Sequence, residues 1–307
     1  MTVSDLGEFG LIEHLKDKFS LAEVGDDTAC IELGGEKILL TCDSLLEGRH
    51  FLPFYPMSAV GWKSVSATIS DIIANGGRPL YLLVTLLLPD LELKKVEELY
   101  EGMTRACEFY GTKIVGGNIV KSEKLGLDLF AIGQTRRFVG RGSAKVGDGV
   151  FVSGTLGDSL AGLELLLMEK KSYEDFELSL IERHLRPTAR IDYVGHISKY
   201  ANASMDISDG LASDIRHMAK RSGLRFNIIK EKLPLSRELY EFAKKHGKDP
   251  YQYALKGGED YQLLFTHPPE KINPFLDMTQ IGYVQDGEGV FVDNKPLEEY
   301  GFDHFRS

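Results

Sequence analysis

The segment from Met205 to Leu211 restricts the fold of this sequence more than any other feature. It places the side chains of Asp206, Ser208 and Asp209 close together, between an apolar run and a stretch with the apolar spacing of a helix. This pattern predicts a strand, a tight turn and a helix whose N-cap is Ser208 or Asp209. Helix capping alone would explain an isolated motif of this kind. The junction of a strand end and a helix N-terminus is also a place where proteins hold Mg²⁺ and phosphate.

Further aspartates occupy comparable positions upstream. Asp27 precedes an expected strand, and Asp43 follows the expected strand at 37–42. Asp71 lies within an expected helix, on a stripe of small and polar residues that could approach another element closely. Each aspartate alone is more often a surface or capping residue. Together they suggest a composite site for Mg²⁺, because this ion prefers hard oxygen ligands and is commonly held together with substrate phosphates.

Charge and length exclude several classes of protein. The net charge of −10 and the absence of a basic run argue against nucleic-acid binding, because phosphate backbones are held by clustered Lys and Arg. The longest strongly apolar run, 81–88, is too short to span a bilayer and is expected to be a buried strand. The three cysteines are widely separated, which favours a reducing compartment. With no targeting segment visible, we expect a cytoplasmic protein that does not bind membranes.

The order of apolar and polar residues predicts a mixed α/β chain, and 307 residues are enough for two domains. The Gly-rich stretch at 140–149 has no apolar periodicity and marks the expected junction, giving domains at 1–139 and 140–307. In the first domain we expect strands at 37–42, 81–88, 112–116 and 127–138, with helices at 58–75 and 90–110. In the second we expect strands at 150–153, before Asp206, and at 224–229, 260–266, 281–284 and 290–293, with helices at 159–170, 174–183, 188–199, 209–222 and 235–246.

Common nucleotide-binding signatures are absent: there is no P-loop, no dinucleotide-binding glycine motif and no protein-kinase signature set. Gly116-Gly117-Asn118 follows an expected strand, and we interpret it as a tight turn whose backbone could approach phosphates. Alone it is a weak signal, because glycine pairs mostly mark ordinary turns.

The order of short motifs along the whole chain resembles the thiamine-monophosphate kinase family. The motifs that carry this resemblance are Gly25-Asp26-Asp27, Thr41-Cys42-Asp43, Gly48-Arg49-His50-Phe51, Ser70-Asp71-Ile72, Gly116-Gly117-Asn118, Arg141-Gly142-Ser143-Ala144-Lys145-Val146-Gly147-Asp148, Asp206-Ile207-Ser208-Asp209-Gly210-Leu211, Gly257-Gly258-Glu259-Asp260-Tyr261 and Gly301-Phe302-Asp303-His304-Phe305. Some of these motifs are shared with a superfamily that includes aminoimidazole ribonucleotide synthetase, selenophosphate synthetase and a hydrogenase maturation protein. The Gly-Gly-Glu-Asp-Tyr and terminal motifs point to the kinase.

The resemblance implies a two-domain α/β fold with mixed sheets, like that of aminoimidazole ribonucleotide synthetase. In a homodimer, the N-terminal domains would pair into a barrel-like sheet, and the C-terminal domain would close over ATP and the substrate. The implied reaction is the ATP-dependent phosphorylation of thiamine monophosphate to thiamine diphosphate, by direct in-line transfer assisted by several Mg²⁺ ions.

The resemblance also implies roles for individual residues. Those implied in catalysis are Asp43, Asp71, Asp206 and Asp209. Those implied in metal binding are Asp27, Thr41, Cys42, Asp43, Asp71, Asn118, Asp206 and Asp209. Cys42 would bind through its backbone carbonyl, because sulfur is a poor ligand for magnesium. Those implied in ATP binding are Gly117, Asn118, Arg141 and Ser208, and those implied in substrate binding are His50, Glu259 and Phe302.

Asn118 departs from the family pattern, which commonly has Asp at this position, so one expected metal contact is neutral. Two other classes of function stay open. A different enzyme of the same superfamily would use the same nucleotide site with another small acceptor, and acceptor-pocket residues such as Glu259 and Phe302 would separate the two cases. A noncatalytic regulator that binds Mg-ATP would have little need for so many acidic positions.

Overall fold

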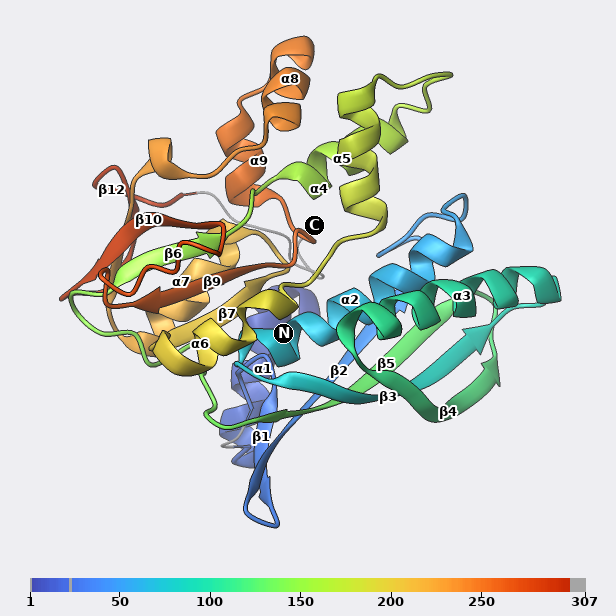
Figure 1. Cartoon of the computed structure of the whole chain (residues 1–307), viewed down its shortest axis with the longest axis horizontal. Helices are drawn as coiled ribbons and strands as arrows, with labels where there is room; N and C mark the ends of the chain where they lie inside the picture. The colour runs from blue at the N-terminus through green and yellow to red at the C-terminus, as the bar shows by residue number, and fades with distance from the viewer. Residues whose placement is uncertain (1, 22–23, 299–307) are drawn as a thin grey trace.

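The computed structural model of this chain describes residues 2–21 and 24–298 and contains two mixed β-sheets (Figure 1). The five-stranded sheet has the order β1-β2-β5-β3-β4. Its strands are β1 (Ala29–Leu33), β2 (Glu36–Leu46), β3 (Arg78–Leu88), β4 (Lys113–Lys121) and β5 (Gly126–Thr135). The seven-stranded sheet has the order β12-β11-β8-β10-β6-β9-β7. Its strands are β6 (Gly149–Ser153), β7 (Ala203–Ile207), β8 (Arg225–Ile228), β9 (Gln262–His267), β10 (Met278–Gln285), β11 (Gly289–Val292) and β12 (Lys295–Pro296).

Two long helices, α2 (Met57–Ala74) and α3 (Leu93–Tyr110), cover one face of the five-stranded sheet (Figure 1). Because side chains alternate across a strand, this face receives the residues of β3 that are nearly inaccessible to solvent. The opposite face is open in the described part of the chain, where Tyr81 and Leu83 are 41% and 40% exposed. The expectation that the whole apolar run at 81–88 is buried was therefore wrong.

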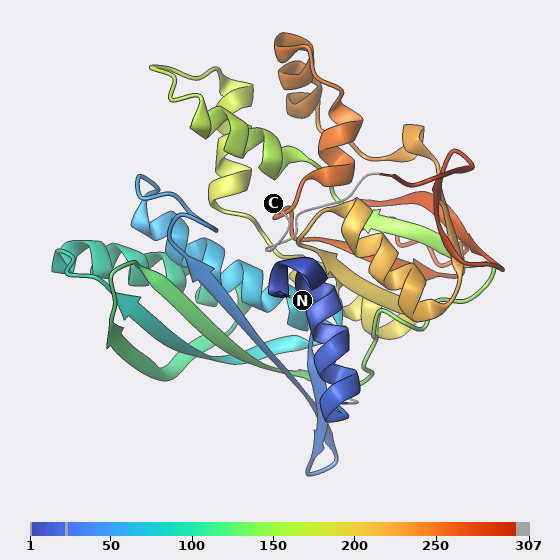
Figure 2. The same cartoon turned by 180° about the vertical axis from the view of Figure 1, so that it is seen from behind.

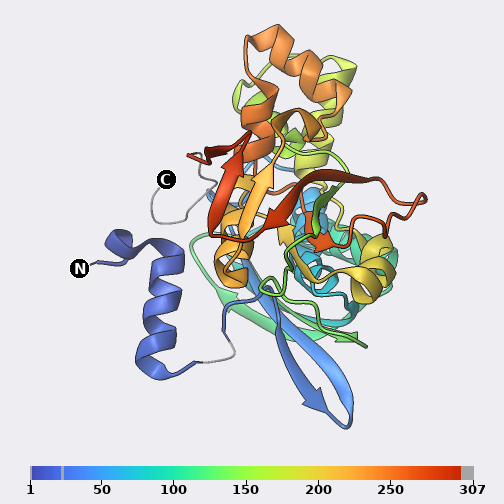
Figure 3. The ribbon, with the colours of Figure 1, turned by 90° about the vertical axis from the view of Figure 1, so that its left-hand side faces the viewer.

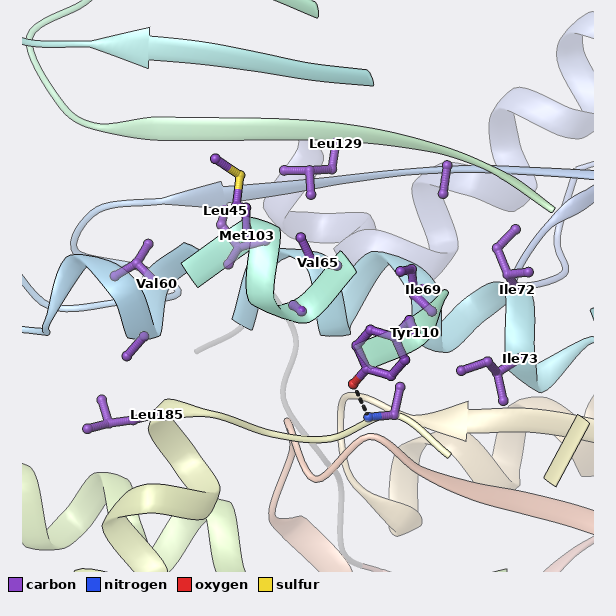
Figure 4. Close-up of a cluster of buried hydrophobic side chains, with 14 of the residues drawn as sticks. Leu45, Val60, Val65, Ile69, Ile72, Ile73, Met103, Tyr110, Leu129 and Leu185 are labelled. Carbon is purple, nitrogen blue, oxygen red and sulfur yellow. Dashed lines mark hydrogen bonds between the residues drawn. The ribbon is translucent and has the colours of Figure 1, made fainter. Parts of the chain in front are cut away.

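The core beneath α2 joins the two halves of the chain. Figure 4 shows Val65 and Ile69 of α2 packed near Leu129 of β5. At the end of α3, the hydroxyl of Tyr110 accepts a hydrogen bond from the backbone N–H of Ala189 at 2.8 Å (Figure 4). The second half of the chain is thus held against the α2–α3 layer by a shared apolar core and a buried hydrogen bond.

The remaining helices are α1 (Val3–Phe19), α4 (Asp158–Leu167), α5 (Asp175–Leu185), α6 (Val194–Tyr200), α7 (Leu211–Ser222), α8 (Arg237–His246) and α9 (Pro250–Lys256). Sequence patterns did not predict α1 or α9. Helix α1 has a non-helical backbone at Gly7 and stands to one side of the main body (Figure 3), and Figure 2 shows it from behind. Within the described residues, no helix combines the length and apolarity that crossing a bilayer requires.

Two local expectations were wrong. Helix α7 begins at Leu211 with Gly210 as its N-cap, rather than Ser208 or Asp209. Gly210 has a φ of 112°, which glycine adopts readily, and its N–H donates to Asp214 Oδ2 at 3.1 Å.

Gly116 and Gly117 lie inside β4 and do not form a turn after a strand. The register with β3 shifts at this point, and a Cβ on Gly117 would lie 1.8 Å from the carbonyl oxygen of Val84. Close backbone approach at an irregular strand pairing therefore explains the glycine pair. The proposed domain junction at 140 lies between the last strand of one sheet and the first strand of the other, and it stays a prediction.

Candidate active site

Three aspartates from distant parts of the sequence meet at the junction of the two sheets. Asp27 comes from the loop before β1, Asp71 from the last turns of α2, and Asp206 from β7. One carboxylate oxygen of each lies within 4.8 Å of the others. The structure thus brings together three of the residues that the sequence predicted as metal ligands.

Burial and mutual repulsion both act on these carboxylates. Burial raises the pKa of Asp27 to about 8, with the charge of Arg141 opposing the shift and that of Asp206 adding to it. Burial also raises the pKa of Asp71 well above its usual value, and the nearby charges of Asp43 and Asp206 reinforce the effect. The protein therefore concentrates more negative charge here than its own cations neutralise.

Strand β2 adds a fourth carboxylate from Asp43, which lies beside the hydroxyl of Thr68 on α2. Burial raises the pKa of Asp43 to about 6, and the charge of Asp206 contributes. Thr41 lies two residues before Asp43 on β2, and its Oγ1 donates a hydrogen bond to Asp71 Oδ2 at 2.6 Å. Thr41 and Asp43 face α2 because side chains alternate along the strand, and Cys42 points to the open face.

The donor set at this cluster fits a hard divalent cation. Asp27 Oδ2 and Asp206 Oδ2 are buried and have no hydrogen-bond partner within the described residues. Buried acceptors without partners are costly, and a cation coordinated by carboxylate oxygens would remove that cost. Magnesium suits oxygen ligands of this type better than zinc does.

Arg141 lies at the start of the Gly-rich junction, on one side of the cluster. Its guanidinium hydrogen-bonds to Asp27, and its backbone N–H donates to both carboxylate oxygens of Asp26 at 3.2 Å. Asn75, at the end of α2, fixes the same loop by accepting the N–H and hydroxyl of Thr28. These contacts hold Asp27 against Asp71 although the two residues are far apart in the sequence.

Sequence reasoning missed Asp214. It is 1% exposed, lies in the first turn of α7, and accepts the N–H of Gly210. Burial raises its pKa well above the usual value, and the charges of Asp209 and Asp206 add to the shift. Its position four residues after Gly210 resembles ordinary helix capping, so no separate sequence signal marks it.

Asn118 is not brought to the acidic cluster within one chain. Through β3 and β5 it lies in the same cross-strand row as Ser44, on the open face of the sheet. Asp43 lies in the adjacent row and faces α2, so the two predicted ligands occupy opposite faces. Gly117 is also remote from the acidic cluster, because it lies on β4, the edge strand farthest from β2.

On another side of the site, Glu259 lies in a buried polar network that the sequence did not predict. Glu259 Oε1 is 2.8 Å from Lys63 Nζ of α2, and Oε2 is 3.7 Å from His184 Nδ1 of α5. His184 also contacts the hydroxyl of Tyr55 at 2.6 Å and that of Ser159 at 2.9 Å. Burial and the charge of Lys63 lower the pKa of His184 to about 3, so its ring is neutral near pH 7.

The loop that carries Glu259 is bonded to the end of β7. The N–H of Glu259 donates to Ser208 O at 2.7 Å, and the N–H of Tyr261 donates to Ile207 O at 3.0 Å. Glu259 and Tyr261 have positive φ angles of 60° and 48°, and a Cβ on Gly258 would lie 2.5 Å from Ser208 O. Strained backbone of this kind persists where surrounding contacts determine it, and it is common at ligand sites.

Asp260 has a structural role in the same motif. Its carboxylate accepts the N–H groups of Gly157 and Ser159 at 2.6 and 3.0 Å, at the start of α4. His50 lies close enough to Glu259 for its charge to affect the pKa of that carboxyl group. Phe302, the third predicted substrate contact, lies outside the described residues.

Comparison with known proteins identifies the fold and the family. Residues 25–135 match the family described as AIR synthase related protein, N-terminal domain. The chain is 62% identical over 306 residues to the thiamine-monophosphate kinase of Aquifex aeolicus (strain VF5), covering 99% of the chain and 100% of that relative. The solved structure of AaThiL complexed with AMPPCP and TMP has a TM-score of 0.98 at 62% identity, covering 99% of each chain. Hydrogenase maturation protein HypE in complex with ATP has a TM-score of 0.71 at 18% identity, covering 99% of this chain and 95% of its own, and shows a shared fold alone.

The two mixed sheets and the acidic cluster at their junction thus define a protein of the AIR synthase-related fold class. With 62% identity over nearly its whole length, the chain belongs to the thiamine-monophosphate kinase family and is an enzyme. The fold class and the family predicted from the sequence are confirmed.

Proposed function

We propose that this enzyme transfers the γ-phosphoryl group of ATP to thiamine monophosphate, which gives thiamine diphosphate and ADP. The observation that carries the proposal is the meeting of Asp27, Asp71 and Asp206, whose oxygens lie within 4.8 Å of one another at the junction of the two sheets. Family membership and the relative solved with AMPPCP and TMP support the two substrates.

We further infer that several Mg²⁺ ions bind together with the phosphates. The side chains that would hold them are Asp27, Thr41, Asp43, Asp71, Asp206 and Asp209. The backbone carbonyl of Cys42 would add a ligand. When bound, the ions would neutralise phosphate charge and orient the donor and the acceptor. Like unit charges about 4 Å apart repel by roughly 4 kcal/mol at an effective dielectric constant near 20, so this neutralisation is needed before two phosphates can meet.

In the proposed transfer, a phosphate oxygen of the acceptor forms a bond to the γ-phosphorus. The bond from that phosphorus to the oxygen bridging the β-phosphate breaks, and ADP leaves with the electron pair. Arg141 and Ser208 would contact the ATP phosphates near the start of α7. The acceptor phosphate is ionised near neutral pH, so the protein has to position it and needs no general base or covalent intermediate.

We propose that the enzyme works as a homodimer. The open face of the five-stranded sheet exposes Tyr81 and Leu83, and a second copy packed there would bury them. Gly117 and Asn118 lie on the edge strand of this sheet, away from the acidic cluster of their own chain. In a dimer, this segment of one copy would contribute to the nucleotide site of the other.

Phosphorus NMR tests the proposed reaction. Purified protein with Mg-ATP and thiamine monophosphate should produce ADP and thiamine diphosphate in equal amounts, and EDTA should stop the reaction. Free thiamine should not be converted, because it lacks the attacking phosphate oxygen. Comparable ADP release with free thiamine would mean that the acceptor is wrong, and the absence of thiamine diphosphate would reject the function.

The proposed compartment remains the cytoplasm. This rests on the sequence argument from separated cysteines, and Cys30, Cys42 and Cys107 are free thiols in the structure.

A further inference from the structure

We propose that Lys63 is a positioning residue for the acceptor: it holds one oxygen of Glu259 so that the other remains available to the amino group of the substrate's aminopyrimidine ring. This inference rests on the proposed function, in which Glu259 binds thiamine monophosphate. Lys63 would touch no substrate and would act only through Glu259.

Lys63 is unusual because it is a lysine inside the core. It is 1% exposed on α2, and its Nζ lies 2.8 Å from Glu259 Oε1. Within the described ranges, the ammonium group makes no hydrogen bond of regular geometry, so its ion pair with Glu259 is the contact that offsets its burial. A lysine is almost never fully buried unless it is paired, so the ion pair with Glu259 explains why the lysine is there.

The pair fixes how Glu259 presents its carboxylate. The Glu259 side chain is 26% exposed, so it is the part of this network that a ligand can reach. Lys63 lies at Oε1, and Oε2 is on the side of His184, beyond hydrogen-bond distance at 3.7 Å. Oε2 is therefore the oxygen that can accept a hydrogen bond from a bound amino group.

His184 does not replace Lys63 as the partner of Glu259. Its Nε2 contacts the hydroxyl of Tyr55, and its Nδ1 contacts that of Ser159. Both ring nitrogens thus have hydroxyl partners, and the ring stacks edge-on against Tyr55. Removal of the Lys63 charge would leave the Glu259 carboxylate with a neutral ring beside it, free to rotate or to take up a proton.

The same loop connects this carboxylate to the phosphate side of the site. The N–H of Glu259 donates to the carbonyl oxygen of Ser208, two residues after Asp206. With its backbone fixed to the Ser208 loop and its side chain fixed by Lys63, Glu259 is held at both ends. The distance between the acceptor's ring and its reacting phosphate would then match a rigid spacing in the protein.

A double-mutant cycle tests the inference. Lys63→Met removes the charge at nearly constant volume, and Glu259→Gln removes the carboxylate. Each variant should raise the KM for thiamine monophosphate by about ten-fold, the loss expected for one charge-assisted hydrogen bond, with the KM for ATP changed less than about two-fold. The double variant should have the acceptor KM of Glu259→Gln alone, because Lys63 acts only through that residue.

Lys170→Met is the control. Lys170 Nζ lies 2.6 Å from Glu177 Oε1, and Glu177 is 1% exposed, so this variant also removes a lysine from a buried carboxylate, although Lys245 Nζ remains at 2.9 Å as a second partner. It should lower the Tm and leave the acceptor KM unchanged. The inference is overturned if Lys63→Met behaves in the same way, if the two effects multiply in the double variant, or if both KM values rise together.

Lys63→Gln replaces Lys63→Met if the methionine variant does not fold. Its amide still donates a hydrogen bond but carries no charge, so its acceptor KM should lie between the wild-type value and that of Glu259→Gln. A wild-type acceptor KM in this variant would overturn the inference. If the wild-type protein makes thiamine diphosphate but the cycle fails, Lys63 alone is misassigned, whereas no turnover of thiamine monophosphate by the wild-type protein would overturn both proposals.

Discussion

At the scale of single residues, Asp71 is an example of a side chain that is unfavourable for the stability of the ligand-free protein and suited to binding a cation. It lies on α2 beside Asp27 and Asp206, and burial together with like charges raises its pKa. In the metal-free protein, this carboxylate must either take up a proton or remain charged among other anions. A cation bound here would be attracted by the same crowded carboxylates, so in the proposed role Asp71 would contribute to binding more than to folding.

We expect Asp71→Asn to lower turnover by at least about 100-fold, because it removes a charge that would hold a cation without changing the shape of the side chain. The Tm of the metal-free variant should equal or exceed that of the wild type, since a repelling carboxylate is gone. Asp43→Asn should behave in the same way. Product assays and circular dichroism melts, with the exposed Asp90→Asn as control, would check this, and wild-type turnover in both variants would refute the metal site.

Asp260 gives a prediction for pH dependence. Burial raises its pKa to about 8 from a usual value near 3.8, with the charge of Asp158 adding to the shift. The folded state then binds a proton more tightly than the unfolded state does, so the free energy of unfolding decreases as the pH rises between these values. Asp260→Asn should lose less stability than the wild type between about pH 5 and pH 8 in urea titrations with EDTA. Equal losses in both proteins would contradict this pKa.

Asp27, Asp206 and Asp71 were predictable because they stand beside strand ends or on a polar stripe of a helix, and those are local patterns. Asp43 lies inside β2, which continues to Leu46 instead of ending before it as expected. Lys63 and Asp214 were not predictable in this way. Lys63 occurs in an ordinary helical segment, and only the fold shows that its side chain runs inward to meet Glu259. A contact between residues so far apart in the sequence leaves no mark in the local pattern of either one.

At the scale of elements, α2 positions side chains on both sides of the site. It carries Asp71 toward the acidic cluster and Lys63 toward Glu259. It packs closely against α3, where a Cβ on Gly102 would lie 2.0 Å from the carbonyl oxygen of Ser58. The positions of the two groups therefore depend on the distance between these two helices.

We expect Gly102→Ala to destabilise the protein by about 1–3 kcal/mol, because the added methyl group would push α3 away from α2. Gly195→Ala in α6 is the control, since a Cβ there would meet no atom within 4 Å. That substitution should be neutral or stabilising by up to about 1 kcal/mol, because alanine has the higher helix propensity. Urea unfolding of both variants would measure the difference, and equal stabilities would show that the helices can separate freely.

Long elements with regular apolar spacing, such as α2, α3 and β5, were predicted close to their observed bounds. Two helices were not. Helix α9 is short and lies between two glycine-containing turns, and α1 contains Gly7 with a φ of 69°. Burial of one face creates the usual helical signal, and Figure 3 shows that α1 lies away from the main body.

At the scale of the whole molecule, the two faces of the five-stranded sheet differ. One face is sealed by α2 and α3, and the other exposes apolar side chains that include Leu83. The apolar run of β3 is explained if both faces are buried in the active state. In the proposed homodimer, a second copy would bury the open face, which would account for an apolar run that covers both faces of β3.

We expect Leu83→Glu to convert a dimer into a monomer, because it places a charge in the middle of the open face. Turnover should decrease as the dimer is lost if one copy supplies Gly117 and Asn118 to the other. Leu93→Glu on α3, where Leu93 is 71% exposed, should remain dimeric and active. Light scattering after size exclusion would give the masses, and a fully active monomeric Leu83→Glu variant would exclude a shared site.

The proposed role of the acidic cluster has a consequence that depends on the order in which the chain is synthesised. Asp27 and Asp71 emerge from the ribosome early, but Asp206 emerges only after the first sheet and much of the second half. Until then the early aspartates have no third partner, and Lys63 has no Glu259 to pair with. If the cluster binds the nucleotide as proposed, a nascent chain would not capture it before Asp206 emerges, and ligand would not guide the folding of the first sheet.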